Sequence, residues 1–140
     1  MQKKENHNKN DAKKNASIVR RAYAAFNKAD METLTETFDE SASWHTPGRS
    51  PIAGDSRGRE AVFAQFVRYG GDTGGTFKAI LIDLYSSDSD RVVGIHHNTA
   101  KRNGKQLDTY CCIVFELKDG RIIDGREHFY DLYNWDEFWS

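Results

Sequence analysis

Ionisable residues recur in segments that otherwise have the composition of apolar strands: His45, one of His96 and His97, Asp108, and Glu127. An ionisable side chain is costly to bury unless it is paired, so several that converge on one interior indicate a cavity with a polar floor. The alternative places such residues on the solvated face of a sheet. The sequence favours the solvated face for Asp108 and the cavity for His45 and Glu127.

The chemistry that these residues support is proton transfer. An imidazole titrates near neutral pH without large tuning, so His45 is the candidate general base. Glu127 would orient this base or act as its partner acid. One imidazole of the adjacent pair would donate to the oxygen on which charge develops. We assign that role to His97 and a substrate contact to His96, although a register slip of one residue exchanges the two.

Metal and cofactor chemistry have less support. Neighbouring residues of a strand face opposite sides of a sheet, so His96 and His97 cannot chelate one ion together. No H-x-H or H-E-x-x-H spacing occurs in the chain. The glycine-rich stretch 70–75 follows a helical pattern and lacks the Gly-Lys-Ser/Thr ending of a phosphate-binding loop. We therefore expect neither a metal nor a cofactor.

Helical patterns come first along the chain, and strand patterns follow. Apolar residues at helical spacing predict helices over 17–28, 31–38 and 59–69. A short strand over 42–46 precedes a loop that extends to Gly58. β-branched and aromatic residues predict four long strands over 77–85, 91–102, 106–118 and 121–130. This order predicts an α+β fold in which three N-terminal helices pack in a strongly curved antiparallel sheet.

The two ends of the chain differ from the part between them. Residues 1–16 carry five Lys and, after Met1, nothing apolar but Ala, which predicts a disordered polar tail before a single domain over 17–140. Six aromatic side chains fall in residues 129–139. Such a segment must be covered, so it either closes the open end of a cavity or covers a dimer partner.

Charge and hydropathy argue against two classes of partner. The 140 residues hold 20 Lys and Arg against 21 Asp and Glu, so the clustered cations of a nucleic-acid binder are missing. No run approaches the roughly 18 apolar residues of a membrane span, and the N-terminus lacks the apolar core of a secretory signal. We expect a cytoplasmic protein that binds neither nucleic acid nor membrane.

The order of the elements resembles the cone-shaped NTF2-like superfamily, and within it the SnoaL-like and ketosteroid-isomerase-like branch. The residues that carry the resemblance are the helix that ends at Ala29-Asp30, the segment 39–42 before Trp44, the run 58–62 and the final segment 126–131. The resemblance implies a homodimer formed through the outer face of the sheet. It also implies a hydrogen bond from Tyr23 to a developing oxyanion and a functional carboxylate at Glu127.

Together, these observations predict a SnoaL-like enzyme of the cyclase or isomerase type, which performs cofactor-free general acid/base chemistry on a small hydrophobic carbonyl compound. The alternative is a non-catalytic binding module for an apolar ligand. The expected catalytic residues are His45, Glu127, Tyr23 and His97. The residues expected to contact the substrate are Trp44, His96, Tyr110 and Phe129.

Overall fold

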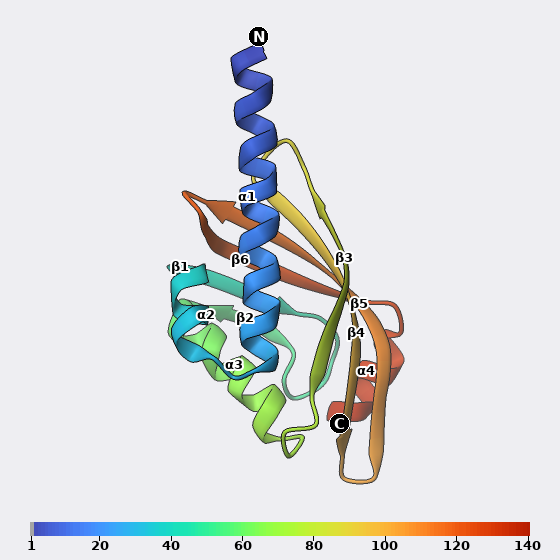
Figure 1. Cartoon of the computed structure of the whole chain (residues 1–140). Coiled ribbons are helices and arrows are strands. Elements are labelled where there is room, and N and C mark those ends of the chain that lie inside the picture. The colour runs from blue at the N-terminus through green and yellow to red at the C-terminus, as the bar shows by residue number, and fades with distance from the viewer. Residues whose placement is uncertain (1) are drawn as a thin grey trace.

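The computed structural model describes the backbone of residues 2–140 and the side chains from Asp11 onward. A six-stranded sheet curls around three helices, and a fourth helix packs against the two strands that come last in the sequence (Figure 1). None of the helices in residues 2–140 is long and apolar enough to cross a membrane. The elements follow in the order α1 (Gln2–Asn27), α2 (Met31–Thr37), β1 (Phe38–Thr46), β2 (Gly54–Arg57), α3 (Arg59–Gly71), β3 (Lys78–Ser86), β4 (Arg91–Arg102), β5 (Lys105–Lys118), β6 (Arg121–Phe129) and α4 (Leu132–Trp139).

The sheet confirms the predicted α+β class. Its strands lie in the order β2-β1-β6-β5-β4-β3. All neighbours are antiparallel except β1 and β6, which run parallel and were not predicted to pair. Register shifts interrupt the β1–β6, β3–β4 and β5–β6 pairs, and such bulges bend a strand and increase its twist. The result is a cone whose concave face receives α1, α2 and α3.

Helix α1 fills the concave side because its apolar stripe matches the helical period. Val19, Ala22, Tyr23 and Ala25 are all buried there. At the end of the helix, the Asn27 side chain donates to the Ala79 carbonyl at 2.8 Å and accepts from the Ala79 N–H at 3.1 Å. The amide thereby pairs with the free edge of β3, and it ties the end of α1 to the sheet.

The start of α1 differs from the sequence-based prediction. The helix begins at Gln2, whereas the sequence predicts a disordered tail over 1–16 and a helix from Ser17. The tail contains no Gly or Pro to interrupt a helix, and its Lys, Glu, Gln and Ala are strong helix formers. Its first turns extend past the end of the sheet (Figure 1). The helix propensity of these residues therefore explains why α1 extends to Gln2.

The aromatic C-terminus forms α4, a helix that the sequence analysis did not predict. Asp131 caps it by accepting from the Asn134 N–H at 3.0 Å. At the other end, Arg102 donates to the Phe138 carbonyl and Lys105 to the Glu137 carbonyl, so cations meet the negative end of the helix dipole. The buried aromatic side chains of this segment cover the core of the same chain: Trp135, Phe138 and Trp139.

Two glycines let aromatic rings lie against bare backbone in the interior. A Cβ at Gly94 in β4 would stand 2.8 Å from the hydroxyl oxygen of Tyr23. A Cβ at Gly125 in β6 would collide with the ring of Trp44, which is paired with that position across the parallel strands. Only glycine permits approaches this close. The two rings that glycine admits both face the cavity described below.

Gly125→Ala should therefore destabilise the protein by about 2 kcal/mol or more, because the Trp44 ring is packed on all sides and has no room to move. Urea unfolding followed by circular dichroism measures the change. Gly70→Ala is the matched control: Gly70 lies in α3, and a Cβ there meets nothing within 4 Å. That control should be neutral or stabilising by up to about 1 kcal/mol. Equal stability of Gly125→Ala and wild type would contradict the close approach.

Candidate functional site

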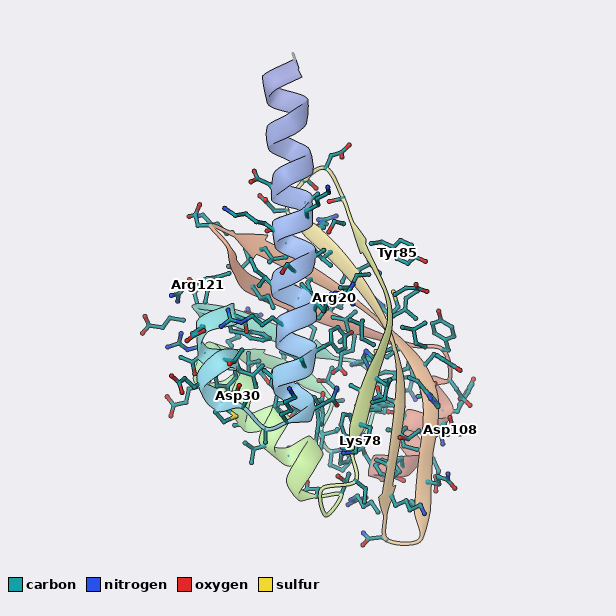
Figure 2. The ribbon with its side chains drawn as sticks, in the orientation of Figure 1. Arg20, Asp30, Lys78, Tyr85, Asp108 and Arg121 are labelled. Carbon is teal, nitrogen blue, oxygen red and sulfur yellow. The ribbon has the colours of Figure 1, made fainter. Side chains whose placement is uncertain are left out.

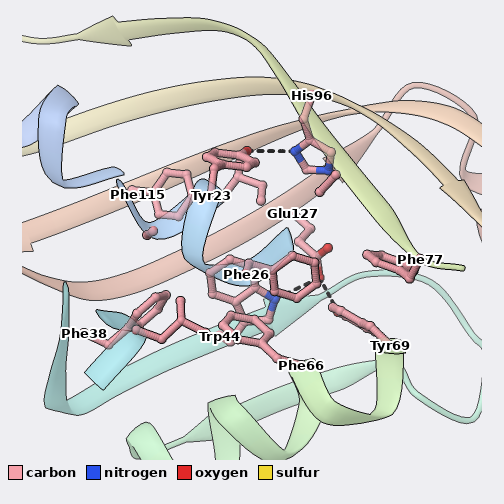
Figure 3. Close-up of a pocket in the computed structure, with 14 residues that line it drawn as sticks. Tyr23, Phe26, Phe38, Trp44, Phe66, Tyr69, Phe77, His96, Phe115 and Glu127 are labelled. Carbon is pink, nitrogen blue, oxygen red and sulfur yellow. Dashed lines mark hydrogen bonds between the residues drawn. The ribbon is translucent and has the colours of Figure 1, made fainter. Parts of the chain in front are cut away.

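An apolar cavity lies between the three helices and the concave face of the sheet (Figure 3). Its volume is about 50 Å³. Most of its walls are aromatic or aliphatic. The residues that line it are Ala22, Tyr23, Phe26, Leu34, Phe38, Trp44, Phe66, Tyr69, Phe77, Ala79, His96, Ile113, Phe115 and Glu127.

Glu127 is the only carboxylic acid among these lining residues. It lies on β6, where alternation turns Gly125 and Glu127 inward and Arg126 and His128 outward. Three donors meet its Oε1 atom: the Tyr69 hydroxyl at 2.6 Å, the Trp44 Nε1–H at 2.9 Å and the Thr46 hydroxyl at 3.1 Å. None of these hydrogen bonds uses Oε2. One carboxyl oxygen is thus fixed by the protein, and the other takes part in none of these three hydrogen bonds.

A second row of side chains fixes the donors themselves. Gln65 on α3 donates to the Ile52 carbonyl at 2.9 Å and to Thr46 Oγ1 at 3.2 Å. The Thr46 hydroxyl, which donates to Glu127, also lies 3.0 Å from the Tyr69 hydroxyl, so the donors contact one another as well as the carboxyl group. The carboxyl group is therefore held by a network that spans α3, β1 and β6.

Burial raises the pKa of Glu127 from 4.5 to about 7, and the hydrogen bonds from Tyr69, Trp44 and Thr46 oppose that rise. The uncharged form gains because the apolar walls cannot solvate a carboxylate, while the three donors stabilise the anion. Both protonation states are consequently populated near neutral pH. A carboxyl group with this pKa can both take and return a proton.

A second polar group lines the cavity at His96, on β4. Its Nδ1 lies 2.7 Å from the Tyr23 hydroxyl, and its Nε2 lies 2.8 Å from Asn98 Oδ1. Burial lowers the pKa of His96 to about 4, so the imidazole is neutral at pH 7. Burial likewise raises the pKa of Tyr23, which keeps its proton. These two rings form an uncharged hydrogen-bonded pair opposite the carboxyl group.

The structure brings four of the predicted site residues together. Tyr23, Trp44, His96 and Glu127 all line the same cavity. Of the two adjacent histidines, His96 is the one that faces inward, so the prediction that gave His97 the place beside the reacting oxygen is wrong.

His45 lies outside the cavity, which corrects its predicted position. On β1 the neighbours Trp44 and Thr46 point inward, so the side chain between them must point outward. There its Nδ1 lies 2.7 Å from Asp55 Oδ1 and its Nε2 lies 2.6 Å from Asp124 Oδ1. The imidazole joins β2, β1 and β6 across the outer face of the sheet and does not reach the interior.

The other three predicted residues also lie outside the cavity lining. His97 hydrogen-bonds Asp108 at 2.7 Å and stacks on Tyr110, with ring centroids 4.8 Å apart. Asp108 projects from the sheet on the side away from α1 (Figure 2), as the sequence favours. Phe129 stacks on Trp135 at a centroid distance of 3.9 Å. Tyr110 therefore packs on the outer face of the sheet, and Phe129 packs against α4.

Three polar residues of the site were not predicted: Thr46, Tyr69 and Asn98. Strand alternation carries a signal for two of them, because Thr46 and Asn98 each follow a cavity residue by two positions. Tyr69 has no such signal. Its helical spacing from Phe66 marks it as one more apolar core residue, and only the packing of α3 against β1 brings its hydroxyl to the carboxyl group.

Comparisons with known proteins agree on the family and the fold. A family model described as a SnoaL-like domain matches residues 19–125. The structure of Bal32a, from a soil-derived mobile gene cassette, is 72% identical in sequence, with a TM-score of 0.92 over 93% of this chain and 99% of that chain. An uncharacterized protein of Mycobacterium tuberculosis is 31% identical over 123 residues, which are 88% of this chain and 94% of the relative. IdmH of Streptomyces antibioticus, a proposed polyketide cyclase, shares the fold at 19% identity, with a TM-score of 0.69 over 83% of this chain and 91% of that chain.

The raised pKa of Glu127 predicts how stability depends on pH. Between pH 4.5 and about 7 the folded chain binds a proton that the unfolded chain has released, so stability falls as pH rises through this window. The loss is on the order of 3 kcal/mol. Glu127→Gln keeps the shape of the side chain but cannot ionise. The unfolding free energy of this variant should therefore not show the decrease between pH 4.5 and about 7.

Urea titrations at a series of pH values measure the effect. Glu116→Gln is the matched control, because Glu116 is an exposed carboxylate on β5 that pairs with Arg91. This variant should keep the pH dependence of wild type. If Glu127→Gln also keeps it, the carboxyl group is not ionising within a buried site.

Proposed function

The chain belongs to the family of SnoaL-like domains, and we propose that its cavity binds a compact carbonyl compound on which Glu127 acts as general base and general acid. The observation that carries this proposal is the asymmetric environment of the carboxyl group. Three donors hold Oε1, none of them bonds Oε2, and the residue lines an apolar cavity. The pKa of about 7 lets the group take and return protons near neutral pH.

The proposed step is proton abstraction from the carbon beside the carbonyl. Oε2 of the ionised Glu127 takes the proton, and the electron pair of the broken C–H bond moves into an enolate. The carboxylic acid then returns the proton to a different carbon of the conjugated enolate, which gives the isomerised compound. In a ring closure, the enolate carbon instead attacks a second carbonyl carbon of the same compound, the electron pair of that C=O bond moves to its oxygen, and Glu127 returns the proton to this oxygen. Tyr69, Trp44 and Thr46 hold the carboxyl group in one orientation during both transfers.

The walls of the cavity support a compact and mostly apolar substrate. Phe26, Phe66 and Phe115 exclude water from the carboxyl group, which strengthens the electrostatic interactions inside. The cavity volume of about 50 Å³ is smaller than the roughly 150 Å³ that admits benzene, so even a ligand of one small ring must move the walls apart, and a large fused one is disfavoured. Proteins of this fold from Streptomyces antibioticus and Sinorhizobium meliloti are described as proposed polyketide cyclases, and TerC has been co-crystallized with polyporic acid. These neighbours support carbonyl chemistry at the level of the fold.

A non-catalytic binding module is the second candidate. The observation that favours it is that the Tyr23 hydroxyl and the imidazole of His96 are hydrogen-bonded to each other. A cavity that only holds an apolar ligand needs no free donor. This candidate predicts that an apolar ligand stabilises the protein without being turned over.

We also propose that the chain forms a homodimer through the outer face of its sheet. Large apolar side chains are half exposed there on β3 and β5, which flank β4, among them Ile80, Tyr85 and Tyr110. Tyr85 projects from β3 on the side away from α1 (Figure 2). Contiguous exposed apolar surface of this kind is typical of an interface.

Hydrogen–deuterium exchange tests the proposed chemistry without knowledge of the natural substrate. Cyclohexanone in D₂O is a suitable probe, because exchange at the carbons beside its carbonyl is followed by proton NMR. The wild-type protein should accelerate exchange, with a rate that rises through pH 7 as Glu127 ionises. Glu127→Gln should lower the accelerated rate by at least about 100-fold, since general base catalysis contributes that much or more.

Two controls separate the role of Glu127 from general effects on the protein. Glu116→Gln and His45→Gln should both leave exchange within about two-fold of wild type, because neither side chain reaches the cavity. Loss of exchange in His45→Gln would restore that histidine as the base. Thermal stabilisation by the ketone in wild type, without any exchange, would favour the binding module.

Light scattering at micromolar concentration tests the dimer. Wild type should show twice the mass of one chain, and Tyr110→Glu should shift the mass towards the monomer by placing a charge in the interface. Val67→Glu is the control, because Val67 is equally accessible on α3, away from the outer sheet face. A monomeric wild-type protein would overturn the proposal.

A further inference from the structure

The hydrogen-bonded pair of Tyr23 and His96 has a direction that neighbouring groups determine. We infer that Asn98 is a positioning residue that directs the Tyr23 proton to His96, so that the Tyr23 oxygen meets a ligand as a hydrogen-bond acceptor. The ligand group bound beside Tyr23 is then a donor, such as a hydroxyl. The inference about ligand class rests on the proposed function for its occupied cavity, whereas the direction of the proton does not.

The backbone of β3 determines the orientation of the Asn98 amide. Asn98 is fully buried on β4, and one end of its amide lies 2.9 Å from the Lys78 carbonyl oxygen. A carbonyl oxygen only accepts hydrogen bonds, so the amide end that faces it must be the NH₂ group. The amide oxygen Oδ1 therefore faces His96. The backbone of β3 thus sets the orientation of this side chain.

The Asn98 amide in turn determines the tautomer of His96. Nε2 lies 2.8 Å from Asn98 Oδ1, which can only accept, so Nε2 carries the ring proton. Burial lowers the pKa of His96 to about 4, so the ring holds one proton and Nδ1 is unprotonated. Nδ1 is consequently an acceptor.

The tautomer of His96 determines the direction in which the Tyr23 hydroxyl donates its proton. It lies 2.7 Å from Nδ1 of His96, and the pair can form a hydrogen bond only if Tyr23 donates. The hydroxyl oxygen also rests against the bare backbone of Gly94, which leaves the tyrosine little freedom to turn away. Its proton is committed to the imidazole. The donation from Tyr23 to an oxyanion, which the family resemblance implies, is therefore unavailable in this arrangement.

The polar groups of the cavity then share one preference. Above pH 7 the carboxylate of Glu127 accepts hydrogen bonds, and the Tyr23 oxygen accepts at any pH at which the tyrosine is protonated. A ligand with a hydroxyl group can donate to the Tyr23 oxygen, whereas a ligand that offers only acceptors places its lone pairs against that oxygen. Such a ligand forgoes one hydrogen bond and binds more weakly. The substrate class is therefore narrowed to hydroxylated compounds.

Nitrogen-15 NMR of the histidine rings tests the direction of the proton without any ligand. His96 is assigned by comparison with a His96→Gln variant. Wild type at pH 7 should show a neutral ring with its proton on Nε2 and a bare Nδ1. A ring protonated on Nδ1, or a doubly protonated imidazolium, would overturn the inference even if Glu127 proves to be the base.

Asn98→Asp should reverse the pair. The new carboxylate accepts from Nε2–H and favours the imidazolium, so Nδ1 becomes a donor and the Tyr23 proton is released to the cavity. NMR titration should show the pKa of His96 raised relative to wild type. Asn103→Asp, in the exposed turn between β4 and β5, is the matched control and should leave the titration unchanged. If Asn98→Asp fails to fold, the wild-type tautomer alone decides the question.

Phenol and anisole serve as probes for the ligand class, because they differ in whether the oxygen can donate. Calorimetry should show wild type binding phenol about three- to ten-fold more tightly than anisole, the range expected for one hydrogen bond. Tyr23→Phe should reduce this ratio, and Asn98→Asp should reduce or invert it. Glu127 is present in all three proteins, so its contribution cancels. The same ratio in wild type and Tyr23→Phe would refute the ligand assignment and leave the acid/base role of Glu127 untouched.

Discussion

The burial of one carboxyl group is the constraint on which the site depends. A buried carboxylate is tolerated only where donors compensate for the lost water, and Glu127 finds its three donors on two different elements. Trp44 and Thr46 come from β1, and Tyr69 comes from α3. Strand β1 must therefore lie beside β6, and α3 must pack against β1. The parallel pairing of β1 with β6 meets that requirement, and Gly125 makes room for the indole that donates.

The sheet separates two sets of ionisable groups by alternation alone. On the concave face, Glu127 and His96 lie among apolar walls. Burial raises the pKa of Glu127 and lowers that of His96, and both shifts favour the uncharged form. On the outer face, His45 lies between two carboxylates, and hydrogen bonding to it lowers the pKa of Asp55. The same residue types therefore do different work on the two faces. Inside they line the cavity, whereas outside they join neighbouring strands.

Much of the fold follows from periodicity, because helices and strands impose different spacings on apolar residues. The predicted strand 91–102 coincides with β4, and the predicted boundaries of β5 and β6 differ from the structure by one residue. The short strand β2 and helix α4 escaped prediction for different reasons. Strand β2 is too short to show a period and is held by its pairing with β1. Helix α4 does have aromatic residues at helical spacing, but a dense aromatic segment also fits a covered loop, and tertiary contacts such as the Arg102 cap hold it as a helix.

The sequence by itself determined that polar residues interrupt apolar strands, and it identified Tyr23, Trp44 and Glu127 as members of one site. It could not determine on which face His45 lies, because a shift of one residue in register moves every side chain of a strand to the other side. Tertiary structure decided that His96 is the inward histidine and that Tyr69 and Asn98 belong to the site. Hydrogen bonds between residues far apart in the chain make these assignments, and such contacts leave no local pattern in a sequence.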